Sequence, residues 1–121
     1  MAKKAPKKTF GQTLREKRIA KGYSLRKFAH EVDVSPTYLS QVEQDKVAPP
    51  TADRVRAMAE MLGENVDELT ALAGRLTEDL PDIIHEAPSA VPDLLRAIRG
   101  LTPDQLRELR ERAERMKGED D

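Results

Sequence analysis

The sequence has no cysteine and very few aromatic side chains. Of its 121 residues, none is Cys or Trp, and only 3% are aromatic. The absence of cysteine excludes disulfides and thiolate metal sites. The two histidines, His30 and His85, lie far apart and have no ligand motif nearby, so no metal site is expected. The core must therefore be built from Leu, Val, Ile, Ala and Met.

Long apolar runs are also missing. No stretch approaches the roughly 20 apolar residues of a membrane-spanning helix, so no membrane association is expected. The basic N-terminus MAKKAPKK has no apolar stretch behind it, which argues against a signal peptide and favours a cytoplasmic protein. The sequence offers no nucleophile–base pair, phosphate loop or metal constellation. Neither catalysis nor a cofactor is therefore expected.

Charge is distributed unevenly along the chain. Residues 1–62 hold 13 Lys and Arg against 7 Asp and Glu, whereas residues 63–121 hold 8 against 15. The two halves thus carry about +6 and −7, although the net charge is only −1. A basic first half suits phosphate binding. The acidic second half should face solvent or protein.

Residues 24–43, SLRKFAHEVDVSPTYLSQVE, predict two short helices joined by a tight turn. Ser24 and Ser35 are placed as N-caps, because a serine oxygen can accept from the free N–H groups of the next turn. Pro36 follows at the first helical position, where it loses no hydrogen bond. The first helix is expected from Leu25 to about Val32 and the second from Pro36.

The second of these helices carries a polar stripe. Its members recur at helical spacing and are uncharged: Thr37, Ser40, Gln41 and Gln44. Gln can bond adenine bidentately and a Thr methyl can touch a thymine methyl, so the stripe suits base reading in the major groove. An ordinary polar surface is the alternative that these residues alone leave open.

Longer segments resemble the helix-turn-helix domain of the Cro and phage-repressor family, also called the XRE family. The matching segments are FGQTLREKR at 10–18, GYS at 22–24, LRKFAHEVDVSPTYLSQVE at 25–43, Pro49–Pro50 and VRAMAEMLG at 55–63. The resemblance implies an all-α fold, with a five-helix phage-repressor-like domain followed by a small helical extension. It also implies double-stranded DNA as a partner, read by the second helix of the motif.

The resemblance assigns roles by position. Base reading falls to Pro36, Thr37, Ser40 and Gln41, and phosphate contacts are predicted for Ser24, Arg26, Lys27, Tyr38, Gln44 and Lys46. A structural ion pair is implied between Arg18 and Glu43, with two separately solvated charges as the alternative. Two residues depart from the family, since Asp33 and Asp45 stand where it usually has glycine. Aspartate tolerates the left-handed conformation at some cost, and an acid there is expected to lower the affinity for phosphates somewhat.

Four segments are predicted along the chain: a disordered basic arm at 1–8, the helix-turn-helix domain at 9–74, a helical dimerisation extension at 75–118 and an acidic tail at 119–121. The arm either adds DNA contacts or is a solvated tail. Within the domain, a helix from Asn65 to about Gly74 is expected to bury Val66, Leu69, Leu72 and Ala73. In the extension, one helix is expected to start at Pro92 and another to run from Pro103 to about Lys117.

The extension carries an apolar seam that is predicted to form a homodimer contact. The residues concerned are Leu94, Ile98, Leu106, Leu109, Ala113 and Met116. A lid packed on its own domain is the alternative. The sequence thus predicts a sequence-specific DNA-binding transcriptional regulator, a repressor that binds a palindromic operator as a homodimer. The rival interpretation is the antitoxin of a toxin–antitoxin pair, with a protein partner on its acidic C-terminal half.

Overall fold

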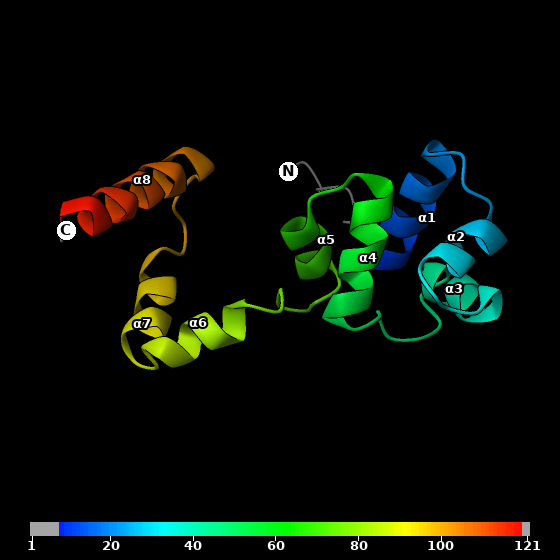
Figure 1. Ribbon diagram of the computed structural model, residues 1–121, viewed down its shortest axis with the longest axis horizontal. Coiled ribbons are helices and arrows are strands. Elements are labelled where there is room, and N and C mark those ends of the chain that lie inside the picture. Colours follow the sequence, from blue (N-terminus) through cyan, green and yellow to red (C-terminus); the bar gives the residue numbers. More distant parts are fainter. Residues whose placement is uncertain (1–7, 120–121) are drawn as a thin grey trace, which may run out of the picture. The chain divides into compact units, whose positions relative to one another are not determined.

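The computed structural model describes residues 8–119, and this part of the chain folds into eight helices without a strand (Figure 1). Most of the predicted basic arm and the end of the predicted acidic tail lie outside the described residues. The helices are α1 Phe10–Ala20, α2 Leu25–Glu31, α3 Pro36–Glu43, α4 Ala52–Leu62, α5 Val66–Leu72, α6 Leu80–Glu86, α7 Ala90–Ala97 and α8 Pro103–Glu119. The predicted all-α fold is confirmed. Within residues 8–119, no helix combines the length and apolar character that crossing a bilayer requires.

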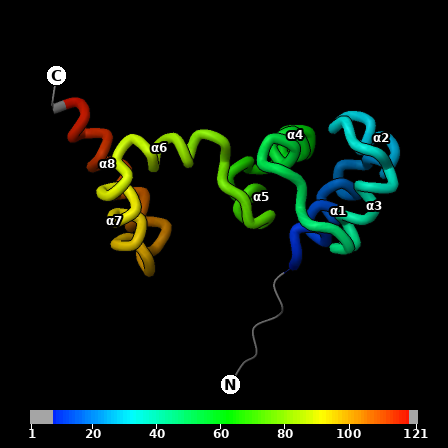
Figure 2. Tube along the Cα trace, turned by 90° about the horizontal axis from the view of Figure 1, so that it is seen from below, coloured from blue at the N-terminus to red at the C-terminus, as the bar shows by residue number. Residues whose placement is uncertain are grey.

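The chain divides into two compact units, one ending at Pro81 and the other starting at Asp82. In the first unit, α1 and α2 pack on α3, and α4 packs on α5 (Figure 2). Their apolar faces meet in a single core of Phe10, Leu14, Phe28, Ala29, Val32, Leu39, Val42, Val55, Met58, Ala59, Leu62, Leu69 and Ala73. Each fully buried large side chain in such a core contributes about 1.5–3 kcal/mol. Leu72 was predicted to join this core, which is wrong: its side chain is 40% exposed.

The two aspartates at family glycine positions both adopt the left-handed conformation. Asp33 has φ 58° and Asp45 has φ 60°. The Asp45 carboxylate accepts a hydrogen bond from the Thr9 hydroxyl at 2.7 Å. The end of α3 also lies so close to α1 that a Cβ on Gly11 would come within 2.3 Å of the Val42 carbonyl oxygen. These contacts fix the end of α3 against the start of α1.

The segment after α5 stays attached to the first unit. The Arg75 guanidinium donates to the carbonyl oxygens of Pro49 at 2.7 Å and Pro50 at 3.1 Å. The buried hydroxyl of Thr77 donates to the carboxylate of Asp67. The chain is therefore held against the first unit for at least three residues beyond Gly74.

The second unit contains α7 and α8. α7 begins at Ala90, so the predicted start at Pro92 is wrong by two residues. Proline is tolerated there because the N–H groups of the first helical turn have no intrahelical partner. α8 begins at Pro103 as predicted, preceded by a reciprocal capping box between Thr102 and Gln105. No residue of α6 or α7 is buried.

Candidate nucleic-acid interface

Local sequence signals set the starts of α2 and α3. Ser24 Oγ accepts from the Lys27 amide at 3.1 Å, and Ser35 Oγ accepts from the Tyr38 amide at 3.0 Å. Both serines therefore cap their helices. Such caps are each worth about 1 kcal/mol. Pro36 occupies the first turn of α3.

An arginine from α4 supports the turn between α2 and α3. Arg54 Nη1 donates to the carbonyl oxygen of Asp33 at 2.8 Å and lies 3.4 Å from that of Val32. These carbonyls follow the last turn of α2, where no later helical N–H can reach them. Arg54 therefore ties α4 to the backbone that sets the angle between α2 and α3.

Arg18 and Glu43 form a buried ion pair between α1 and α3. Arg18 Nε lies 2.7 Å from Glu43 Oε2, and Nη2 lies 2.9 Å from Oε1. Their side chains are only 10% and 4% exposed. Arg18 Nη1 also donates to the Tyr23 carbonyl at 2.9 Å. This bidentate pair joins the end of α3 to α1 and to the loop before α2.

The four residues predicted to read bases line one shallow hollow between the starts of α2 and α3. Pro36, Thr37, Ser40 and Gln41 share it with Leu25 and Arg26, and its volume is about 350 Å³. Pro36, Thr37 and Gln41 are exposed, whereas Ser40 is half-buried. The hollow thus presents an amide, two hydroxyls and a guanidinium together, which are the groups that hydrogen-bond base edges and phosphates.

A hydrogen bond from the C-cap residue of α3 orients Ser40. Gln44 Nε2 donates to Ser40 Oγ at 2.8 Å and to its carbonyl oxygen at 3.2 Å. Ser40 Oγ thereby acts as an acceptor toward Gln44, which leaves its hydroxyl hydrogen available to donate elsewhere. The Gln44 oxygen likewise remains available as an acceptor.

The residues predicted to contact phosphates differ in exposure and in the contacts they already make. Arg26, Lys27 and Lys46 are exposed. Ser24 is occupied as an N-cap but keeps its own hydroxyl hydrogen. Tyr38 is half-buried and packs against the core, so only part of its ring faces outward. Phosphate binding by these residues stays a prediction.

Two contacts near α3 were not expected from the sequence. One is the hydrogen bond from Arg54 to the turn, and the other is that from Thr9 to Asp45. An aspartate at a family glycine position indicates a strained turn that other contacts must stabilise, but the sequence does not identify the residues that make those contacts. The Thr9 contact turns the Asp45 carboxylate toward the start of α1, where the helix dipole favours negative charge.

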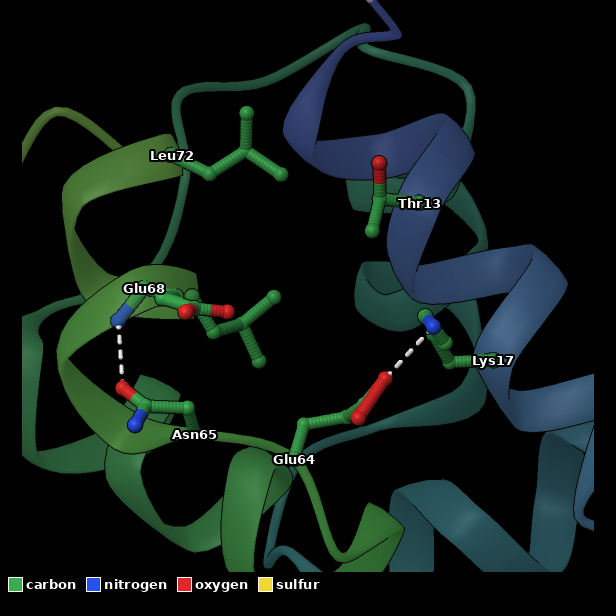
Figure 3. A pocket seen from close by; sticks show the side chains of 7 residues that line it. Thr13, Lys17, Glu64, Asn65, Glu68 and Leu72 are labelled. Carbon is green, nitrogen blue, oxygen red and sulfur yellow. Dashed lines mark hydrogen bonds and ion pairs between the residues drawn. The ribbon is translucent and has the colours of Figure 1, made fainter. Parts of the chain in front are cut away.

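A second hollow lies between α1 and α5, and none of its lining residues belongs to α2 or α3 (Figure 3). Its volume is about 220 Å³, and it is lined by Thr13, Lys17, Glu64, Asn65, Glu68, Leu69 and Leu72. Lys17 and Glu64 point toward each other there, with Nζ and Oε1 2.7 Å apart. This hydrogen bond raises the pKa of Lys17. Across residues 8–119, no group of three His, Asp or Glu side chains is arranged to hold a metal ion.

The residues predicted to dimerise lie on α7, α8 and the turn after α7. Leu94, Leu106, Ala113 and Met116 are exposed, and Ile98 and Leu109 are half-buried. Their apolar surface is thus largely uncovered by the described part of the chain.

Part of the chain is similar to known helix-turn-helix proteins. A protein-family model described as "Helix-turn-helix" matches residues 14–69. No curated protein matches the chain. One similar solved structure is that of SinR from Bacillus subtilis, the master regulator for biofilm formation, in complex with DNA. The two sequences are 30% identical, and the match covers 50% of this chain and 97% of that one, with a TM-score of 0.47.

Two further solved structures are similar over more of the chain. The SinR–SinI complex matches at 25% identity over 91% of this chain and 99% of that one, with a TM-score of 0.48. The clp gene regulator ClgR of Corynebacterium glutamicum matches at 28% identity over 78% and 90%, with a TM-score of 0.47. With the family-model match and the capped α2–turn–α3 unit, the chain belongs to the XRE-type helix-turn-helix family of DNA-binding transcriptional regulators.

Proposed function

We propose that this regulator recognises a specific palindromic operator through α3, binds it as a homodimer and acts as a repressor. The observation that carries the proposal is the hollow in which Thr37, Ser40 and Gln41 lie beside Arg26. Uncharged hydrogen-bonding groups next to an exposed cation suit a surface that reads bases while a neighbouring group neutralises a phosphate. A purely solvated face would more usually carry Lys and Glu.

The distribution of charge along the chain supports DNA binding through the α2–α3 face. The charge of about +6 on residues 1–62 includes Arg26, Lys27 and Lys46 on or near α2 and α3. The excess of acids lies in residues 63–121, which hold α5 to α8. DNA would therefore be attracted to the α2–α3 face and repelled from the acidic segments.

A single copy of α3 is too short to specify an operator, so we expect the chain to bind DNA as a dimer. One α3 spans only a few base pairs, and two symmetry-related copies about 34 Å apart would read two half-sites of a palindrome. The exposed apolar residues of α7 and α8 offer a surface for this pairing. A dimer bound over a promoter would exclude the polymerase, so repression needs no further component.

Selection of bound DNA from a random library tests the proposal. The full-length chain should enrich a pseudo-palindromic sequence whose half-sites are centred about one helical turn apart. Enrichment of an unrelated, non-repeated sequence would contradict dimeric reading. No enrichment above input would contradict sequence-specific binding altogether.

The antitoxin interpretation remains the second candidate. It is favoured by the exposed apolar side chains of α6 to α8 within an acidic half, a combination that would suit a basic protein partner. Sedimentation of the purified chain separates the two candidates. A homodimer formed without any other protein supports the first, and a monomer that assembles only with a basic partner supports the second.

A further inference from the structure

The apolar seam of α8 is not covered by its own chain. Leu106 is 37% exposed and Met116 is 65% exposed, Ala113 is exposed, and Leu109 is half-buried. These four residues recur at spacings of three and four, as the a and d positions of a heptad do. A helix with one apolar face gains most of its stability from covering that face.

Between residues 103 and 118, the charged residues beside this seam are all basic. The flanking positions in this stretch hold Gln105, Arg110, Arg112 and Lys117, and each is exposed, while the last residue of α8, Glu119, takes the next flanking position. The acids of α8 that lie on its opposite side are Asp104, Glu108, Glu111 and Glu114. Arg110 lies 3.8 Å from Glu114, but both are about two-thirds exposed, so this pair offsets little of the flanking charge. The seam therefore has a basic border.

A basic border disfavours pairing of α8 with α8 of a second copy. In a parallel pair, Arg112 of one helix would face Lys117 of the other. In an antiparallel pair, Arg110 would face Lys117. Residues at these flanking positions choose the partner and its orientation in helix pairs, and like charges there are unfavourable. The complementary surface should be apolar with an acidic border.

α6 has this character. Leu80 is 37% exposed, Ile83 is 41% exposed, and Ile84 is half-buried. The only Asp, Glu, Lys or Arg residues on α6 are Asp82 and Glu86, and Asp79 immediately precedes the helix. Apolar side chains thus lie beside carboxylates and no Lys or Arg, the opposite of the α8 border.

We propose that α8 of one copy packs on α6 of a second copy. The inference rests on the proposed homodimer and specifies which surfaces meet in it. In a two-fold symmetric dimer the contact occurs twice, α8 on the partner's α6 and α6 on the partner's α8, which doubles the apolar area covered. Each contact sets a basic border against an acidic one.

Charge reversal in the full-length chain tests this pairing. The α8 variant carries Arg110→Glu, Arg112→Glu and Lys117→Glu. The α6 variant carries Asp79→Lys, Asp82→Lys and Glu86→Lys. A control variant reverses charges on the far side of α8, with Glu108→Lys, Glu111→Lys and Glu114→Lys. Circular dichroism establishes that each variant keeps its helical content, and sedimentation equilibrium gives the dimer dissociation constant.

The α8 and α6 variants should each dimerise at least about tenfold more weakly than the wild type, and the control should not. An equimolar mixture of the α8 and α6 variants should regain wild-type affinity as a heterodimer, because both contacts become complementary again. If α8 instead pairs with α8, the α6 variant dimerises normally and the α8 variant binds wild-type chain more tightly than itself, which overturns the inference. A wild-type dimer that neither variant weakens overturns it as well, while the proposed homodimer stands. A wild-type chain that stays monomeric refutes both.

Discussion

Arg54 in the first turn of α4 donates to the backbone carbonyl of Asp33, the left-handed residue between α2 and α3, with Nη1 and O 2.8 Å apart. A non-glycine residue at φ 58° costs free energy, although aspartate bears this better than most residues. The helix-turn-helix turn of this chain is therefore held from outside the motif, by a cation on the next helix.

The first prediction concerns this contact. Arg54→Ala should lower the free energy of unfolding by about 0.5–1.5 kcal/mol, since a charged donor to the exposed Asp33 carbonyl is lost. Asp33→Gly should raise it by about 1 kcal/mol by relieving the left-handed strain. Urea denaturation measures both. The Arg54→Ala loss should persist in the Asp33→Gly background, because the carbonyl remains. Its disappearance there would mean that Arg54 acts on the Asp33 side chain instead.

The second prediction concerns the buried ion pair. Arg18→Ala should cost about 3–5 kcal/mol of folding stability, because it leaves the Glu43 carboxylate buried and unpaired. The double variant Arg18→Met, Glu43→Leu should be more stable than Arg18→Ala, since no buried charge remains. Thermal unfolding compares them. At temperatures where Arg18→Ala is folded, its preference for operator over random DNA should match the wild type. A changed preference would place Arg18 in the reading surface.

Much of the fold could be predicted from local signals. Ser24, Ser35 and Pro36 mark the helix starts by short-range chemistry, and the structure places α2 and α3 accordingly. Helical periodicity alone also predicts that Thr37 and Gln41 lie together on the exposed face of α3. Local signals do not determine which apolar side chains are covered. Leu72 fits the apolar pattern of α5, yet it lines a hollow instead of joining the core.

The resemblance implied the Arg18–Glu43 pair, but two other long-range contacts could not be predicted from one sequence. Arg54 reaches a carbonyl 21 positions earlier, and Thr9 reaches Asp45 across 36 positions. Neither pair has a spacing that any helix or turn rule couples. Both depend on how α1 and α4 pack around α3, which only the three-dimensional structure gives.

The third prediction compares two buried threonines. Thr70 is 1% exposed, and its hydroxyl has no hydrogen-bond partner among residues 8–119, whereas the Thr77 hydroxyl donates to Asp67. Thr70→Val should raise the free energy of unfolding by about 1 kcal/mol, and Thr77→Val should lower it by about the same amount. Chemical denaturation measures both. A loss on Thr70→Val as large as that on Thr77→Val would show that Thr70 makes a hydrogen bond in solution.

The fourth prediction concerns the phosphate contacts. Replacing Arg26, Lys27 or Lys46 by Ala should weaken binding to every DNA sequence and lower the slope of log affinity against log salt by about one unit. Fluorescence anisotropy at several salt concentrations measures this slope. Lys17→Ala is the matched control, because Lys17 faces Glu64 between α1 and α5 and should leave the slope unchanged. A residue whose removal leaves the slope unaltered does not contact a phosphate.

The fifth prediction addresses base reading by α3 itself, through the exposed amide of Gln41. The most direct test measures the affinity of wild type and Gln41→Ala for the selected operator, for its single-base variants and for random DNA. The variant should lose about 1–3 kcal/mol on the operator, discriminate less at one base pair in each half-site, and bind random DNA as the wild type does. An equal loss on operator and random DNA would place Gln41 on the phosphate backbone and contradict base reading by this face of α3.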